Sequence, residues 1–111
     1  MQNLTSKFSA LGDQTRFAIV EQLLSDGELS VNELKKDSKI SPPAFSRHLK
    51  VLREAGLIHQ RVDQQRRLYS VKPEAVRAIH AWTMDHQEFW LASIDRLENA
   101  LNQHEKDNPN E

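Results

Sequence analysis

The chain has 111 residues, of which 38% are hydrophobic and none is cysteine. This length suits one small domain, and the lack of thiols excludes disulfides, thiolate metal sites and thiol-based redox sensing. No stretch approaches the ~20 apolar residues of a membrane span, and the first residues do not form a signal peptide. We therefore expect a cytoplasmic protein.

The net charge of −1 hides a strong separation of charge along the chain. Residues 1–40 carry five Lys and Arg against six Asp and Glu, residues 41–72 carry seven against two, and residues 73–111 carry three against eight. A locally basic segment attracts a polyanion whatever the average charge of the chain is. The middle segment is therefore a candidate for binding nucleic acid, with ordinary surface charge as the alternative.

Three helices are predicted in the first part of the chain. Leu4, Phe8 and Leu11 recur at helical spacing and predict a short helix that ends at Gly12. Asp13 can cap a second helix, which runs to a turn at residues 25–27. The apolar face of this helix is expected to contain Phe17, Ile19, Val20, Leu23 and Leu24. Ser30 and Glu33 have the spacing of a capping box, which predicts a short third helix.

A fourth helix is predicted directly after Ser41, a good N-cap, with Pro42 at the first helical position. Ile40 and Phe45 occupy the two positions of a hydrophobic staple, and Gly56 ends the helix. The expected buried stripe consists of Phe45, Leu49 and Leu52. Two short helices joined by a tight polar turn form a helix-turn-helix, whose second helix reads DNA in the major groove.

The segments that follow predict a wing and a long last helix. Residues 57–62 and 67–71 alternate as two strands joined by a polar tip at residues 63–66. After Pro73, apolar residues at spacings of three and four predict one helix, bent near its start, to about residue 103. Its apolar stripe is too long for so small a domain to cover, so we expect a second copy to cover it.

Candidate DNA contacts lie on the open side of the fourth helix and in the wing. Arg47 is expected to reach guanine or a phosphate, Ser46 a base edge or a phosphate, and Lys50 a phosphate. Arginine in a hairpin suits backbone contact or insertion into the minor groove. The predicted contacts are Ser41, Pro43, Ser46, Arg47, Lys50, Arg61, Arg66 and Arg67. The alternatives are a solvated helix face and a solubilising edge strand, and the register that would place Arg61 and Arg67 on the same face stays open.

Three motifs carry a resemblance to a known family. They are Leu11-Gly12-Asp13-x-Thr15-Arg16, Ser46-Arg47-His48-Leu49-Lys50-x-Leu52 and Arg53-Glu54-Ala55-Gly56-Leu57. Residues 4–100 resemble the ArsR family of bacterial transcriptional repressors. The resemblance implies a winged-helix homodimer, joined through the first and last helices, that binds a pseudo-palindromic operator and is released by an inducer. The expected interface residues are Leu4, Phe8, Trp82, Trp90, Ile94, Leu97 and Leu101.

The chain departs from this family in ways that bear on its signal and its DNA contacts. Ser30 and Asn32 stand where many relatives carry a Cys-x-Cys pair for arsenic, cadmium or lead. Pro42 and Pro43 stand where the family often has polar residues, which moves the expected base readout to Ser46 and Arg47.

The last helix lacks the metal-ligand pairing of the zinc-sensing relatives, so we expect no metal and no cofactor. Its candidate ligands are His80, Asp85, His86, Glu88 and His104. His86 lies within the apolar stripe, where a histidine packed at a dimer seam is the simpler interpretation. The rings of Trp82, Phe89 and Trp90 favour an interface core, with a ligand pocket as the alternative.

The predicted fold is mainly α with a small β-hairpin, a winged helix-turn-helix that dimerises through its first and last helices. Residues 1–104 form the DNA-binding and dimerisation domain, and residues 105–111 a frayed polar tail. We expect a regulator of transcription, a repressor, that binds double-stranded DNA and lacks the thiolate metal site. The alternatives are a repressor that senses metal through His, Asp and Glu on the last helix, and a module that binds protein. No phosphate-binding loop, nucleophile motif or catalytic carboxylate pair points to an enzyme.

Overall fold

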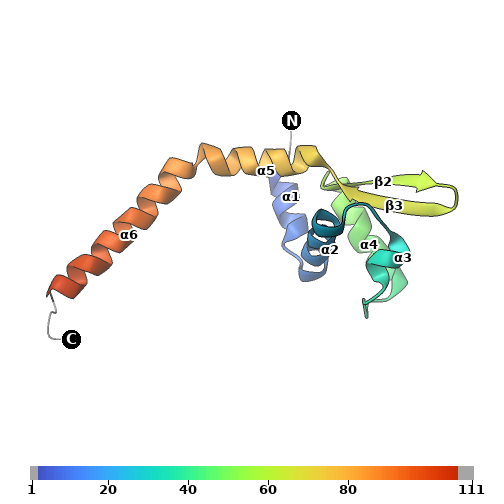
Figure 1. Cartoon of the computed structure of the whole chain (residues 1–111), viewed down its shortest axis with the longest axis horizontal. Coiled ribbons are helices and arrows are strands. Elements are labelled where there is room, and N and C mark those ends of the chain that lie inside the picture. Colours follow the sequence, from blue (N-terminus) through green and yellow to red (C-terminus); the bar gives the residue numbers. More distant parts are fainter. Residues whose placement is uncertain (1–2, 108–111) are drawn as a thin grey trace. The chain divides into compact units, whose positions relative to one another are not determined.

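The computed structural model describes residues 3–107 of the chain. The chain divides into two compact units, one up to Ile79 and one from His80 onward, and each is described by itself. Its elements are α1 (Leu4–Leu11), α2 (Gln14–Asp26), β1 (Leu29–Ser30), α3 (Val31–Lys35), α4 (Pro42–Glu54), β2 (Ile58–Asp63), β3 (Arg66–Val71), α5 (Pro73–Asp85) and α6 (Gln87–Asp107) (Figure 1). None of the helices between residues 3 and 107 is long and apolar enough to cross a membrane.

The helix starts are set by the caps that the sequence predicts. The Asp13 carboxylate accepts the backbone N–H of Arg16 at 3.0 Å and caps α2. The capping box of α3 is confirmed, since the Ser30 hydroxyl accepts from the Glu33 N–H and the Glu33 carboxylate accepts from the Ser30 N–H. Ser41 caps α4. These bonds satisfy backbone donors that a helix start leaves without partners, so each helix begins at a defined residue.

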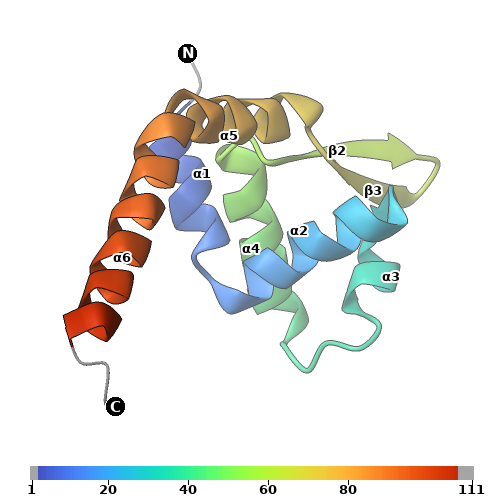
Figure 2. The same cartoon turned by 60° about the vertical axis from the view of Figure 1, so that its left-hand side comes forward.

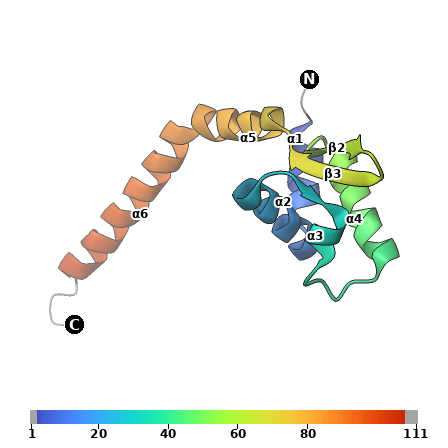
Figure 3. The ribbon, with the colours of Figure 1, turned by 45° about the vertical axis from the view of Figure 1, so that its right-hand side comes forward.

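The described residues form one three-stranded antiparallel sheet in the order β1-β3-β2 (Figure 3). The wing, which is the β2–β3 hairpin, closes through a two-residue turn because Asp63 pairs with Arg66. Gln64 in this turn has a φ of 59°. The strands thus extend into the tip that was predicted at residues 63–66. The strand β1 was not predicted, because two residues are too few to show an alternating pattern.

The core of the first unit lies under α4, which packs against α1 and α2 (Figure 2). The predicted stripe of α4 is confirmed, since Phe45, Leu49 and Leu52 are buried. On α2 the buried face is narrower than predicted: three apolar side chains are buried, whereas Phe17 and Leu24 are exposed. The start of α5 closes the core through the fully buried Ala75. One side of α4 is therefore held in the core, and the opposite side is exposed.

The predicted single long helix is two helices, which meet at His86 between α5 and α6. The His86 backbone N–H donates to the Thr83 carbonyl, and the ring Nδ1 donates to the Trp82 carbonyl at 2.9 Å. The side chain thus takes the carbonyl that the backbone N–H of a regular α-helix would bind, which interrupts the hydrogen-bond ladder. Residues 105–107 of the predicted tail continue α6, and residues 108–111 lie outside the described residues.

Candidate nucleic-acid interface

The exposed side of α4 carries the polar and basic residues that the sequence analysis singled out. Pro43, Ser46, Arg47 and Lys50 are all exposed. The Lys50 ammonium lies 3.9 Å from the Glu54 carboxylate one turn on, a pair between two exposed side chains that is worth little. Arg47 forms no ion pair with any residue between 3 and 107. Its guanidinium is therefore available to a ligand outside the chain.

A polar contact between two distant motifs ties α4 to the junction of α1 and α2. The Arg16 guanidinium donates through Nε to the Ala10 carbonyl at 2.7 Å, and its Nη1 lies 3.2 Å from Nδ1 of His48. Because a guanidinium only donates, Nδ1 of His48 accepts, which places the ring proton on Nε2. The Asp13 carboxylate lies 3.8 Å from the same Nδ1. The backbone N–H of Arg16 is the main cause that lowers the pKa of Asp13.

This network holds the residue next to Arg47 and was missed by the sequence analysis. Arg16 and His48 stand 32 positions apart, and each was noticed only as part of a family motif. Neither motif contains a signal of local structure that would pair the two side chains. The contact joins α4 to the junction of α1 and α2, in addition to the buried stripe of α4.

The register of the wing decides which face each arginine occupies. Arg61 pairs with Leu68, Val62 with Arg67, and Asp63 with Arg66. Because directly paired residues share a face and neighbours along a strand alternate, Arg61 and Arg66 lie on one face and Arg67 on the other. All three side chains are exposed. The wing thus presents cations on both faces near its tip, which answers the question that the sequence left open.

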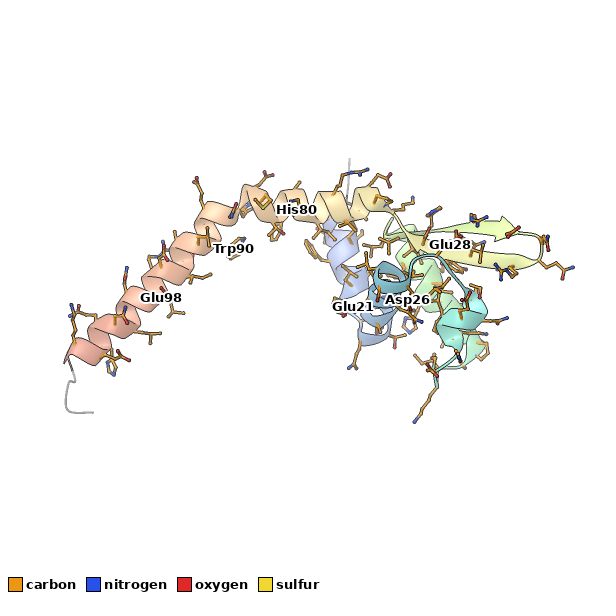
Figure 4. All side chains as sticks on the ribbon, viewed as in Figure 1. Glu21, Asp26, Glu28, His80, Trp90 and Glu98 are labelled. Carbon is orange, nitrogen blue, oxygen red and sulfur yellow. The ribbon has the colours of Figure 1, made fainter. Side chains whose placement is uncertain are left out.

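Arg61 differs from the other two arginines because it is already bound to a carboxylate. Its Nε donates to Oε2 of Glu28 at 2.7 Å, and its Nη2 donates to Oε1 at 2.8 Å. Figure 4 shows Glu28 beside the two long strands of the wing. The hydrogen bonds from Arg61 are the main cause that lowers the pKa of Glu28. The sequence analysis missed Glu28, which stands 33 positions from its partner.

Replacing Arg61 with alanine should return the pKa of Glu28 toward its ordinary value of 4.5. A pKa that is depressed in the folded state stabilises the fold above the unfolded-state pKa, and this contribution is lost as the pH falls through the folded-state pKa. Arg61→Ala should therefore make the unfolding free energy fall less steeply below pH ~4.5. Carboxyl NMR titration and urea unfolding at several pH values check both effects. Arg67→Ala, on the opposite face, should leave the Glu28 titration unchanged; a similar rise there would contradict the assignment.

The predicted interface residues lie in both units. In the second unit, Trp82, Trp90, Ile94, Leu97 and Leu101 are exposed, and the Leu97 side chain is 61% exposed. The Trp90 ring lies 4.9 Å from that of Phe89 in an edge-on contact and 6.5 Å from that of Trp82. In the first unit, Leu4 is partly buried and Phe8 is exposed. Between residues 80 and 107 the apolar stripe of the second unit is thus exposed along its length.

The described residues bring together no group of three His, Asp or Glu side chains that could hold a metal ion. Ser30 is engaged in the capping box of α3, and Asn32 beside it is exposed. On the last two helices, His86 uses Nδ1 for the Trp82 carbonyl and lies 5.1 Å from the Trp82 ring. This histidine therefore has a role in the break between α5 and α6.

Known proteins match this chain both in sequence and in fold. The sequence model of the bacterial regulatory protein, arsR family, matches residues 13–60. The HTH-type transcriptional regulator Rv2034 of Mycobacterium tuberculosis is 41% identical over 87 residues, which cover 78% of this chain and 78% of that protein. The arsenic resistance transcriptional regulator ArsR1 of Pseudomonas putida is 35% identical, over 77% of this chain and 69% of its own.

Solved structures of transcriptional regulators have a similar fold. The ArsR family transcriptional regulator RHA00566 matches with a TM-score of 0.70 at 33% identity, covering 78% of this chain and 89% of that one. HlyU from Vibrio cholerae matches with a TM-score of 0.61 at 32% identity, covering 73% of this chain and 88% of its own. The fold is a winged helix-turn-helix, mostly helical with a small antiparallel sheet. The chain therefore belongs to the arsR family of bacterial regulatory proteins.

Proposed function

We propose that this protein is a sequence-specific DNA-binding regulator of transcription that acts as a repressor. The observation that carries the proposal is the exposed side of α4, where Arg47 has no ion-pair partner between residues 3 and 107 and the opposite side is buried. A helix fixed in this way can enter a major groove with its side chains free to meet base edges. The relatives, which are regulators of transcription, support the same assignment.

Each proposed contact has its own role. Arg47 is assigned to guanine O6 and N7, and Ser46 to a base edge or a phosphate. Lys50 contacts phosphate as a point charge, which positions the protein without reading sequence. Ser41 and Pro43 lie at the N-terminus of α4, where backbone N–H groups favour an anion. Arg66 and Arg67 flank the wing turn on opposite faces and so reach both walls of a groove.

The proposed active species is a homodimer. The stripe of the second unit, from Trp82 to Leu101, is apolar and exposed, and a second copy offers an identical surface to cover it. Leu4 and Phe8 of α1 are proposed to join the same interface. Two reading helices related by a two-fold axis bind two half-sites, which we place 10–10.5 base pairs apart or a multiple of that.

Titration of duplex DNA with the full chain at increasing salt tests the proposal. Phosphate contacts release counterions, so the logarithm of the association constant should fall linearly with the logarithm of the salt concentration, by ~0.9 per contact. Fragments selected from the source genome should bind more tightly than random duplex at the same salt. A chain that bound no duplex at low salt would be a protein-binding module, and the proposal would be rejected.

A further inference from the structure

We propose that Glu28 occupies the edge of the Arg61 guanidinium that a DNA phosphate takes, so that Arg61 binds a phosphate through this edge only after exchanging the carboxylate for it. The inference rests on the proposed DNA-binding function and deepens it. In this proposal the Glu28 carboxylate competes with DNA phosphates for Arg61 and so lowers the affinity of the wing for the DNA backbone.

The geometry of the pair is the first support. Glu28 offers two oxygens, and Arg61 meets each with a separate nitrogen, at 2.7 Å and 2.8 Å. A phosphate offers the same arrangement of two anionic oxygens, which is why arginine binds both groups in this two-pronged way. The Nε–Nη2 edge of the guanidinium cannot hold both anions at once. Arg61 therefore gives this edge either to the carboxylate within the chain or to a phosphate outside it.

The position of Glu28 in the sheet is the second support. It stands directly before β1, and the register aligns Ser30 of β1, Leu68 of β3 and Arg61 of β2 across the sheet. The Arg61 side chain thus reaches across the central strand to the far edge. A bond over this distance turns the guanidinium along the sheet. Arg66 lies on the same face, but its side chain forms no ion pair with a carboxylate between residues 3 and 107.

The charges around Glu28 are the third support. After Arg61, electrostatic interactions with His59 and Arg66 also lower its pKa, so the carboxylate lies among the basic side chains of one wing face. A negative charge at such a place repels approaching phosphates and cancels part of the attractive field. Figure 4 shows Glu28 beside the wing.

The pair is also exposed enough to exchange. The Arg61 and Glu28 side chains are 52% and 33% exposed, and water reaches both. The two-pronged geometry makes this pair stronger than most surface ion pairs, but water and salt screen it. A phosphate that arrives with the rest of a duplex offers the same geometry and can replace the carboxylate.

The test is a double-mutant cycle on DNA binding. Wild type, E28Q, R61A and E28Q/R61A are titrated with a random-sequence duplex of roughly 30 base pairs at several NaCl concentrations. E28Q should bind about fivefold more tightly at low salt, with a salt dependence like that of the wild type, because Arg61 contacts a phosphate in both complexes. R61A should bind more weakly than the wild type, with a salt dependence shallower by ~0.9, because one phosphate contact is gone. In the R61A background the gain from E28Q should shrink to the gain that any lost surface charge gives.

A matched control separates competition from general charge. E21Q removes the same charge from α2, where Glu21 is exposed and pairs with no cation between residues 3 and 107. The change in DNA affinity of E21Q measures the gain that any lost negative charge produces. The gain in affinity from E28Q should be larger. Carboxyl NMR of the wild type gives a readout that needs no variant: the pKa of Glu28 should rise when the duplex binds, because Arg61 leaves it.

Three outcomes would overturn the inference while leaving the proposed function in place. First, the wild type binds duplex with a normal salt dependence, but E28Q binds no better than E21Q. Second, the gain from E28Q is as large in the R61A background as in the wild type. Third, the Glu28 pKa does not rise in the complex. A wild type that binds no duplex at low salt would reject both the function and the inference.

Discussion

Arg47→Ala should lower the affinity for the operator by about 1–3 kcal/mol and reduce the preference for operator over random DNA. Arg47 is exposed on α4 and forms no ion pair with residues 3–107, so its removal leaves the fold intact. The loss arises because a bidentate bond to guanine is replaced by unpaired acceptors on the base. Titration of operator and random duplex at one salt concentration measures the affinity and the preference.

Lys50→Ala is the matched control for this result. Lys50 lies on the same exposed side of α4 and is proposed to contact phosphate alone, so its loss should weaken operator and random DNA by similar factors. If Arg47→Ala also weakened both duplexes equally, Arg47 would be a phosphate contact, and base readout would have to come from other residues. Equal unfolding midpoints for both variants and the wild type would show that each loss of DNA affinity comes from a lost DNA contact and not from a less stable fold.

Leu97→Glu should convert the protein to a monomer and remove most of its operator affinity. The substitution places a carboxylate in the middle of an apolar surface that the proposed dimer buries, without a partner for its charge. We expect a cost of about 3 kcal/mol, roughly a hundredfold in the dimer dissociation constant. Operator affinity falls with it, because a single reading helix engages one half-site at a time. Sedimentation equilibrium and duplex titration measure the two effects.

Asn99→Glu is the control for the dimer experiment. It adds the same charge to the same helix two positions on, on nearly the opposite side of α6. This variant should stay dimeric and bind operator almost as the wild type does. A Leu97→Glu protein that remained dimeric would show that the stripe of α6 is not the interface, and the two copies would have to meet through another surface.

Much of the first unit could be predicted because its signals are local. Ser30 with Glu33, and Ser41 with the Pro42 that follows it, lie within one turn of each other, where the spacing of donor and acceptor is set by helix geometry. The stripe of Phe45, Leu49 and Leu52 follows from the same geometry. The sequence therefore predicted where the helices start and which side of α4 is buried, and hence that Arg47 is exposed.

The break at His86 shows where local patterns mislead. The apolar spacing continues through this residue, and neither proline nor glycine marks an interruption. At the end of α5 one side chain, that of His86, takes a backbone carbonyl in place of the backbone N–H. Apolar periodicity does not report such a choice, so the single long helix was the natural interpretation of the pattern.

By itself the sequence determined the family motifs, the caps, the basic middle segment and the exposed side of α4. Only the tertiary structure decided which distant residues meet: Arg16 with His48, and Glu28 with Arg61. It also decided, through the register of β2 with β3, that Arg61 and Arg67 lie on opposite faces of the wing. The physical reason is separation along the chain. Contacts within one turn follow from backbone geometry, whereas contacts across some thirty residues depend on how whole elements pack.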